Sequence, residues 1–180
     1  DREAVFVAAA KFWADILVSP VTIEIDAEFS STLTCNSNSA TLGSAGPASS
    51  FLFANTANLI GLQSNVFYPT ALINAYNGSD RFPNNADISA RFNARLGDSD
   101  CLSARSWYYG LDGNTPSNQI DFFDIVRHEV GHGLGILSLA NDDGTDGSRV
   151  DIFTTFLHDQ STGKNWTDMS DAERNVSVTN

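Results

Sequence analysis

Residues 121–135 read Asp-Phe-Phe-Asp-Ile-Val-Arg-His-Glu-Val-Gly-His-Gly-Leu-Gly. Apolar side chains recur in and just before this stretch at the spacing of one helix face, which predicts a half-buried helix. They are Ile120, Phe123, Val126, Val130 and Leu134. Asn118, with Asp121 three residues later, is the predicted N-terminal cap pair. Gly135 is the predicted left-handed residue that ends the helix and reverses the chain.

Two histidines and a glutamate lie on this helix. His128 and His132 are four residues apart, so both imidazoles project from one face and can reach one tetrahedral zinc ion. Glu129 is offset by one residue and is expected beside the metal, where it can take a proton from a zinc-bound water. The pattern arises by chance in about one in a thousand chains of this composition. It predicts a catalytic zinc site with two histidine ligands and Glu129 as general base.

The alternative interpretation is a structural helix whose histidines are hydrogen-bonded to the backbone inside the core. Gly131 and Gly133 count against this alternative, because each costs a helix about 1 kcal/mol relative to Ala. A helix selected only for stability would avoid both glycines. They therefore favour the metal site.

The motif His128-Glu129-x-x-His132-x-x-Gly135 resembles that of the metzincin clan of zinc metalloendopeptidases. It is more similar to secreted bacterial metalloproteases with His-Glu-x-Gly-His-Gly-Leu-Gly, whose catalytic domain can be interrupted by a protease-associated domain. The similarity extends to three further segments, Ala86–Ile88, Trp107–Asn114 and Trp166–Arg174. The resemblance implies an α+β, zincin-like fold, with a mixed twisted sheet packed on an N-terminal helix and on the active-site helix.

Two positions depart from the metzincin pattern. The clan's third ligand follows the glycine by three residues, and here that position is Ser138, a poor zinc ligand. The clan also places a methionine turn beneath the metal, often with a tyrosine two residues later. Met169 fits such a turn, with core filler as the alternative, and Asp171 stands where the tyrosine would be. The resemblance therefore implies a Met-turn but leaves the third ligand open.

A catalytic zinc normally takes three protein ligands and a water. The candidates beyond Gly135 are Asp151, His158 and Asp159. Residue chemistry favours His158, the only remaining histidine, whereas the resemblance favours the carboxylates. Asp159 begins a turn-like stretch, where an aspartate commonly bonds to its own backbone. The third ligand is thus expected to be Asp151 or His158. The two are not expected to bind the same metal, because side chains alternate between the two sides of an extended segment.

Further acidic residues near the motif have two interpretations each. Asp121 and Asp124 are either hydrogen-bond acceptors for the imidazoles or, as we favour, charges that stabilise the helix N-terminus. The acidic loop 141–147 either holds calcium or, with the better support, is a solvated turn, since its spacing does not fit the helix-loop-helix calcium pattern. Calcium is therefore only a weakly supported second metal.

Periodicity in the rest of the chain predicts alternating helices and strands, which indicates an α+β or α/β domain with a mixed sheet. We expect one domain spanning residues 1–180, although 176–180 end without a clear stop to the fold. The predicted elements are a helix over 4–18 stopped by Pro20, a strand over 21–29, a loop with short extended pieces over 30–50, a helix over 70–76 ended by Asn77-Gly78, and strands over 88–92 and 107–111.

Composition excludes several classes of protein. The chain of 180 residues is 42% hydrophobic and 11% aromatic, so it can build a core and is not disordered throughout. Its net charge of −12 argues against nucleic acid or an anionic membrane surface as a partner. The longest apolar runs, 4–10 and 135–140, are far shorter than the ~20 residues of a bilayer span. We expect a monomer that binds neither nucleic acid nor membrane.

Residue usage indicates export. Only Lys11 and Lys164 are lysines, and the chain begins with Asp1, which is consistent with the removal of a signal peptide and a pro-segment. Cys35 and Cys101 have no partner at metal-ligand spacing, and in an oxidising compartment they are expected to form a disulfide. The alternative is two buried free thiols.

The predicted function is that of a secreted zinc-dependent endopeptidase acting on protein or peptide substrates. The alternatives are a catalytically inactive zincin-fold module that binds metal or a partner, and a non-peptidase hydrolase on the same helix motif. Glu129 argues against the inactive module, because a structural metal site needs no base at that position. The cleavage-site preference cannot be read from the sequence.

Overall fold

The computed structural model describes residues 1–53, 61–145 and 149–179. Its central sheet has the strand order β1-β5-β2 and is formed by β1 (Ile25–Ser30), β5 (Ile88–Asn93) and β2 (Gly43–Pro47). β5 pairs in parallel with β1 and antiparallel with β2, so the sheet is mixed, as predicted. Helix α1 (Arg2–Ala14) packs on helix α3 (Phe122–Leu134), and α3 packs on β2 and β5. The predicted α+β class is confirmed.

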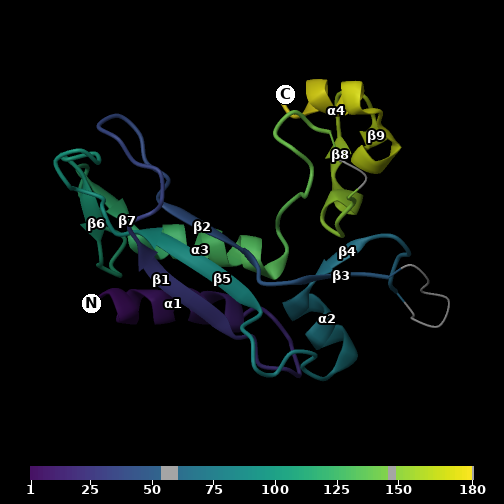
Figure 1. Ribbon diagram of the computed structural model, residues 1–180, viewed down its shortest axis with the longest axis horizontal. Helices are drawn as coiled ribbons and strands as arrows, with labels where there is room; N and C mark the ends of the chain where they lie inside the picture. Colours follow the sequence, from purple (N-terminus) through teal and green to yellow (C-terminus); the bar gives the residue numbers. More distant parts are fainter. Residues whose placement is uncertain (54–60, 146–148, 180) are drawn as a thin grey trace.

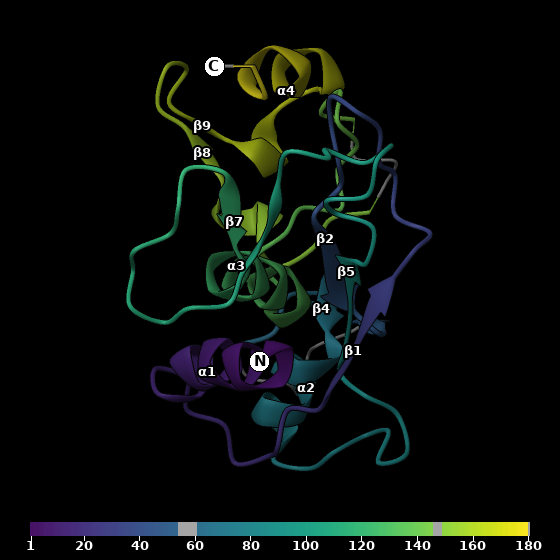
Figure 2. The same cartoon turned by 90° about the vertical axis from the view of Figure 1, so that its left-hand side faces the viewer.

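The main core lies between the two helices and one face of the sheet. Figure 2 shows α1 and α3 next to each other on the same side of β1, β5 and β2. Alternate residues of β5 point into this space, with Ile88, Ala90 and Phe92 at most 1% exposed. The remaining buried members are Val5, Ala9, Trp107, Phe122, Val126 and Val130. Burial of this set fixes the distance between α3 and the sheet.

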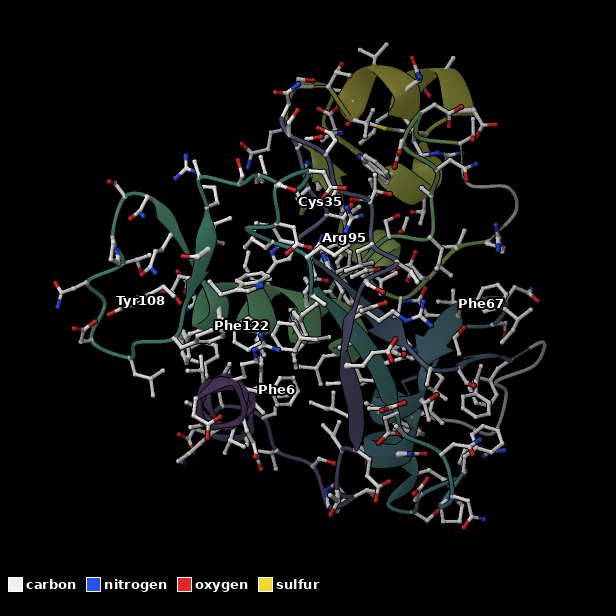
Figure 3. The ribbon with its side chains drawn as sticks, turned by 60° about the vertical axis from the view of Figure 1, so that its left-hand side comes forward. Phe6, Cys35, Phe67, Arg95, Tyr108 and Phe122 are labelled. Atoms are coloured by element: carbon white, nitrogen blue, oxygen red, sulfur yellow. A yellow bond between two sulfur atoms is a disulfide. The ribbon has the colours of Figure 1, made fainter. Side chains whose placement is uncertain are left out.

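Phe122 is the centre of an aromatic cluster in that core. Its ring centroid lies 5.0 Å from that of Phe92, 5.2 Å from Phe29 and 5.3 Å from Trp107. Figure 3 shows Phe6 and Phe122 on the sides of α1 and α3 that face the sheet. The sequence pattern assigned this place to Phe123, which is only half-buried. The face of α3 is thus rotated slightly from the predicted stripe, although Val126 and Val130 are buried as expected.

The glycines of the motif allow α3 to approach its neighbours closely. A Cβ atom on Gly133 would lie 2.9 Å from Cδ1 of Ile88 and closer still to its Cγ2. A Cβ atom on Gly131 would lie 3.2 Å from Cζ2 of Trp13, whose indole N–H donates to the carbonyl of Arg127 at 2.9 Å. Both glycines therefore have a packing role. Their presence does not argue for a metal site, contrary to the inference from helix propensity.

Substituting Gly133→Ala is expected to destabilise the fold by about 1–3 kcal/mol, because the new methyl group overpacks against Ile88 on a central strand. Gly131→Ala is the matched control. Its methyl group would meet the edge of Trp13 and, at ordinary contact distance, Ile136, and the gain in helix propensity of about 1 kcal/mol offsets these contacts. Urea unfolding of the three proteins measures both changes. Equal stability of the two variants would contradict the packing role of Gly133.

The remaining elements form small peripheral units. Strand β3 pairs antiparallel with β4, β6 pairs in parallel with β7, and β8 pairs antiparallel with β9. We call the unit from η1 to α4 (154–177) the C-terminal lobe, which Figure 1 shows set apart from α3. The bounds are β3 Ser50–Leu52, β4 Phe67–Pro69, α2 Thr70–Asn77, β6 Ser106–Tyr108, β7 Gln119–Asp121, η1 Thr154–Phe156, β8 His158–Asp159, β9 Lys164–Asn165, η2 Trp166–Asp168 and α4 Asp171–Ser177.

Several predicted boundaries were wrong. The N-terminal helix ends at Ala14 instead of 18, because Trp13 inserts against α3 and the chain then turns towards β1, leaving Ile16 59% exposed. The first strand begins at Ile25 instead of 21, since that is where its partner β5 begins. Of the strand expected over 107–111, only the first two residues belong to a strand, β6, which begins at residue 106. The sequence did not predict β7. The helix over 70–76 and its end at Gly78 (φ 69°) are confirmed.

The disulfide between Cys35 and Cys101 is confirmed, with 5.2 Å between the Cα atoms. It joins the loop before β2 to the loop after β5, and Figure 3 shows Cys35 beyond the end of the sheet. No helix among the described residues is long and apolar enough to cross a membrane.

Replacing both cysteines by serine is expected to lower the free energy of unfolding by about 3–4 kcal/mol, because the bridge closes a long loop in the unfolded chain. The two residues are 66 apart in the sequence. Urea unfolding of the oxidised protein and the double variant measures the difference. Reduced wild-type protein is the control and should match the variant; unchanged stability after reduction would contradict the prediction.

Candidate metal centre

Helix α3 is fixed at both ends. At its start the Asp121 carboxylate accepts hydrogen bonds from the N–H groups of Phe123 (2.9 Å) and Asp124 (3.4 Å). Asp121, and not Asn118, is therefore the N-cap. At its end Gly135 adopts a left-handed conformation (φ 107°), as predicted, and the N–H of Ile136 donates to the carbonyl of Gly131. With Val126 and Val130 buried, the opposite face of α3 presents the histidines.

The two histidines converge on one point. Nε2 of His128 lies 3.0 Å from Nε2 of His132, and the ring planes are inclined by 85°. Two nitrogens that share a tetrahedral zinc ion at about 2.0–2.1 Å lie roughly 3.3 Å apart. The separation in this structure is close to that value, so the pair fits a common metal ion.

The other ring nitrogen of His132 has a partner that suits a metal ligand. Nδ1 lies 2.8 Å from the carbonyl oxygen of Ile136, which the turn at Gly135 brings back over the helix end. Donation from Nδ1–H leaves the lone pair on Nε2, the atom that faces His128. A backbone carbonyl is a common partner for a metal-binding histidine. This contact was not predicted from the sequence, because it depends on the path of the chain after the helix.

Glu129 lies beside the pair, beneath the edge of the sheet. Glu129 is only 8% exposed, and its side chain packs against Gly43, the first residue of β2. Glu129, His128 and His132 line a single groove of about 860 Å³. The structure therefore brings together the three motif residues in one open groove.

Two segments far from the motif in the sequence help to line the groove. Phe12 and Trp13 of α1 form the first, and the Arg127 guanidinium lies 5.1 Å above the Phe12 ring. Residues 40–43, which end at the first residue of β2, form the second. Neither segment was anticipated at the groove, since each lies far from the motif in the sequence.

The acidic residues at the start of α3 do not contact the histidines. Asp121 caps the helix and accepts from Thr115 Oγ1 at 2.6 Å, and Asp124 pairs with Arg127 at 3.0 Å. The favoured interpretation of both as N-terminal helix charges agrees with these contacts.

Asp151 has a structural role in this conformation. Its carboxylate is buried and accepts from Leu139 N (2.7 Å), Thr154 N (2.8 Å) and Thr154 Oγ1 (2.7 Å). Ser138, at the position of the expected third histidine, hydrogen-bonds to the same Thr154 hydroxyl at 2.7 Å. The chain after Gly135 returns to Asp151, and the carboxylate of Asp151 holds this segment through the backbone of Leu139.

The two other candidates lie in the C-terminal lobe. His158 is exposed on the β8–β9 hairpin, with Nδ1 3.0 Å from Asn165 Oδ1, whereas Asp159 is buried on the other side of β8. Asp159 binds its own turn through Ser161 and Thr162, as expected for that residue, and the hydrogen bond from the Ser161 hydroxyl holds the pKa of its carboxyl well below its usual range. Across residues 1–53, 61–145 and 149–179, no group of three potential metal ligands converges.

Met169 lies in the C-terminal lobe as well. It is buried, and its carbonyl accepts from Arg174 Nη1 at 2.6 Å. Its burial inside this lobe fits the core-filler alternative, and a Met-turn beneath the histidines stays a prediction.

Residues 141–145 of the acidic loop form a turn. Asp143 accepts from Thr145 N and Oγ1, and these hydrogen bonds lower the pKa of its carboxyl. The carbonyl of Gly144 accepts from the buried Arg174 side chain at 2.8 Å. Asp146 and Gly147, which complete the proposed calcium loop, lie outside the described residues. The described contacts agree with the favoured acidic turn.

Comparison with known proteins gives one match. A family model described as SPBPB7E8-like matches residues 3–161, a range that includes all but the first residue of α1, the central sheet and the whole of α3. No curated protein and no solved structure matches the chain. The chain, with its histidine pair and groove, belongs to the SPBPB7E8-like family.

Proposed function

We propose that this protein is a zinc-dependent endopeptidase. The observation that carries the proposal is the convergence of His128 and His132, with Nε2 atoms 3.0 Å apart, in a groove that also contains Glu129. Two nitrogen donors at metal-ligand separation, next to a carboxylate outside the pair, suit a hydrolytic metal site better than a structural one.

Each of the three residues has a distinct role. The Nε2 atoms of His128 and His132 would hold a metal ion, and the Ile136 carbonyl would keep the His132 ring in the required tautomer and orientation. A bound zinc ion would supply Lewis-acid chemistry at this point, since zinc can lower the pKa of water to about 7 and polarise a carbonyl group. Glu129 accepts the proton released by the attacking water and delivers it to the leaving amine.

The groove suits an extended peptide. β2 is an edge strand of the sheet, and the Asn93 N–H donates to the Leu42 carbonyl at 2.9 Å. In an antiparallel ladder this register directs the backbone groups of Gly43 and Ala45 away from β5. A substrate strand added at this edge would gain main-chain hydrogen bonds and lie beside Glu129. A protein or peptide is therefore the proposed substrate.

Asp151 and His158 both remain candidates for the third metal ligand. If Asp151 bound the metal, its carboxylate would lose three hydrogen bonds, whereas binding by His158 would require the C-terminal lobe to approach α3.

A disulfide is typical of proteins in oxidising compartments, and it supports the proposal that the enzyme is secreted. We further propose a monomer that binds neither nucleic acid nor membranes, in keeping with the net charge of −12.

One observation favours a second candidate function. Only two potential ligands converge among the described residues, which also fits an inactive zincin-like module that binds metal or a partner. Atomic absorption of the purified protein, together with casein or gelatin cleavage with and without a chelator, separates the two. The endopeptidase requires bound zinc and cleavage that the chelator abolishes and added zinc restores. Bound zinc without cleavage would favour the inactive module.

A further inference from the structure

Gly43 occupies the space next to the Glu129 side chain. A Cβ atom built on Gly43 would lie 2.7 Å from Cγ of Glu129, 2.9 Å from Oε1 and 3.0 Å from Cδ. Real Cβ atoms essentially never approach other heavy atoms this closely. The contact therefore involves the carboxylate itself as well as the aliphatic part of the side chain.

The backbone on both sides of this contact is held in place. Gly43 pairs with Phe92 of the central strand, a residue that is 1% exposed. The helix that carries Glu129 is anchored by the fully buried Val126 and Val130. A methyl group at position 43 would therefore displace the Glu129 side chain rather than the strand or the helix.

Alternation along β2 shows that this contact is specific to one face. Gly43 and Ala45 share the face towards α3, and Ala45 packs against the main core. Gly46 has the opposite orientation, and a Cβ atom there would meet nothing within 4 Å. The strand thus contains two glycines, of which only one lies against the carboxylate.

We propose that Gly43 is a positioning residue, whose missing side chain allows the Glu129 carboxylate to stay in the groove beside His128 and His132. This inference rests on the proposed function, in which Glu129 transfers the proton. A side chain at position 43 would move the base away from the reacting water, and a displacement of about 1 Å can lower a rate by about 10²-fold.

The first experiment compares Gly43→Ala with Gly46→Ala in peptide hydrolysis. For Gly43→Ala we expect kcat to fall by at least about 10-fold, with KM and zinc affinity within about twofold of wild type. Gly46→Ala should retain wild-type kcat, because its methyl group points into open space. Wild-type kcat for Gly43→Ala would overturn the proposal.

The second experiment needs no activity. In a double-mutant cycle on unfolding stability, Gly43→Ala should destabilise the wild type but not Glu129→Ala, in which the clashing atoms are absent. The cycle also decides the matter if Gly43→Ala alone does not fold, since the double variant should then fold. An equal loss of stability in both backgrounds would overturn the proposal. If the wild-type protein hydrolyses no peptide, the proposed function fails, while the cycle still tests the contact between Gly43 and Glu129.

Discussion

Glu129→Gln is expected to lower the rate of peptide hydrolysis by about 10²- to 10⁴-fold, the usual contribution of a positioned general base. Glutamine has nearly the same shape, so it should fill the space beneath Gly43 without disturbing the packing of α3 on β2. It cannot accept the proton from the attacking water. The fold and the zinc content should therefore remain those of the wild type, and steady-state kinetics with atomic absorption measure both.

Glu28→Gln is the matched control for this substitution. Glu28 lies on β1, exposed to solvent, and pairs with Arg91 at 3.3 Å, a contact that contributes little to stability. This variant should keep full activity. Near-normal hydrolysis by Glu129→Gln would show that another group accepts the proton, and the mechanism proposed for the groove would be wrong.

The histidine helix was the most predictable part of the fold. Val126 and Val130 are buried, and the helix ends at Gly135, because a strong apolar period and a left-handed glycine are local signals. The cap was misplaced by three residues, since Asp121 rather than Asn118 accepts the first N–H groups. Choosing between two good capping residues depended on β7, a strand of three residues that sequence periodicity cannot reveal.

Only those residues of the site that lie on α3 could be predicted from the sequence. Spacing placed His128, Glu129 and His132 together because all three project from one rigid element. The Ile136 carbonyl and Gly43 were missed, because the first depends on a turn and the second on the packing of a distant strand. The third ligand could not be chosen for the same reason. The sequence placed no competing partner beside Asp151, but in the structure its carboxylate accepts three hydrogen bonds from neighbouring groups.

His132→Ala and His128→Ala are each expected to weaken zinc binding by about 10²-fold or more. A structural zinc site with four ligands supplies about 10–16 kcal/mol, so the loss of one ligand removes several kcal/mol. The two variants should behave alike, because their Nε2 atoms converge on one point. Equilibrium dialysis measures the affinity directly. Thermal unfolding provides a second measure, since zinc at 100 times its dissociation constant stabilises a protein that binds it only when folded by about 2.7 kcal/mol.

The metal-free proteins provide the control for these two variants. In the metal-free protein both variants lose the exposed contact between the two Nε2 atoms, whereas His132→Ala also loses its hydrogen bond to Ile136, which costs about 1 kcal/mol more. His158→Ala tests the third ligand in the same assay. A comparable loss of zinc affinity would mean that the C-terminal lobe closes onto α3 when metal binds. Unchanged affinity would exclude His158 and leave Asp151 as the candidate.

Full zinc affinity in both His128→Ala and His132→Ala would show that the metal does not bind at α3, because the two nitrogens are the only potential ligands that converge there among the described residues.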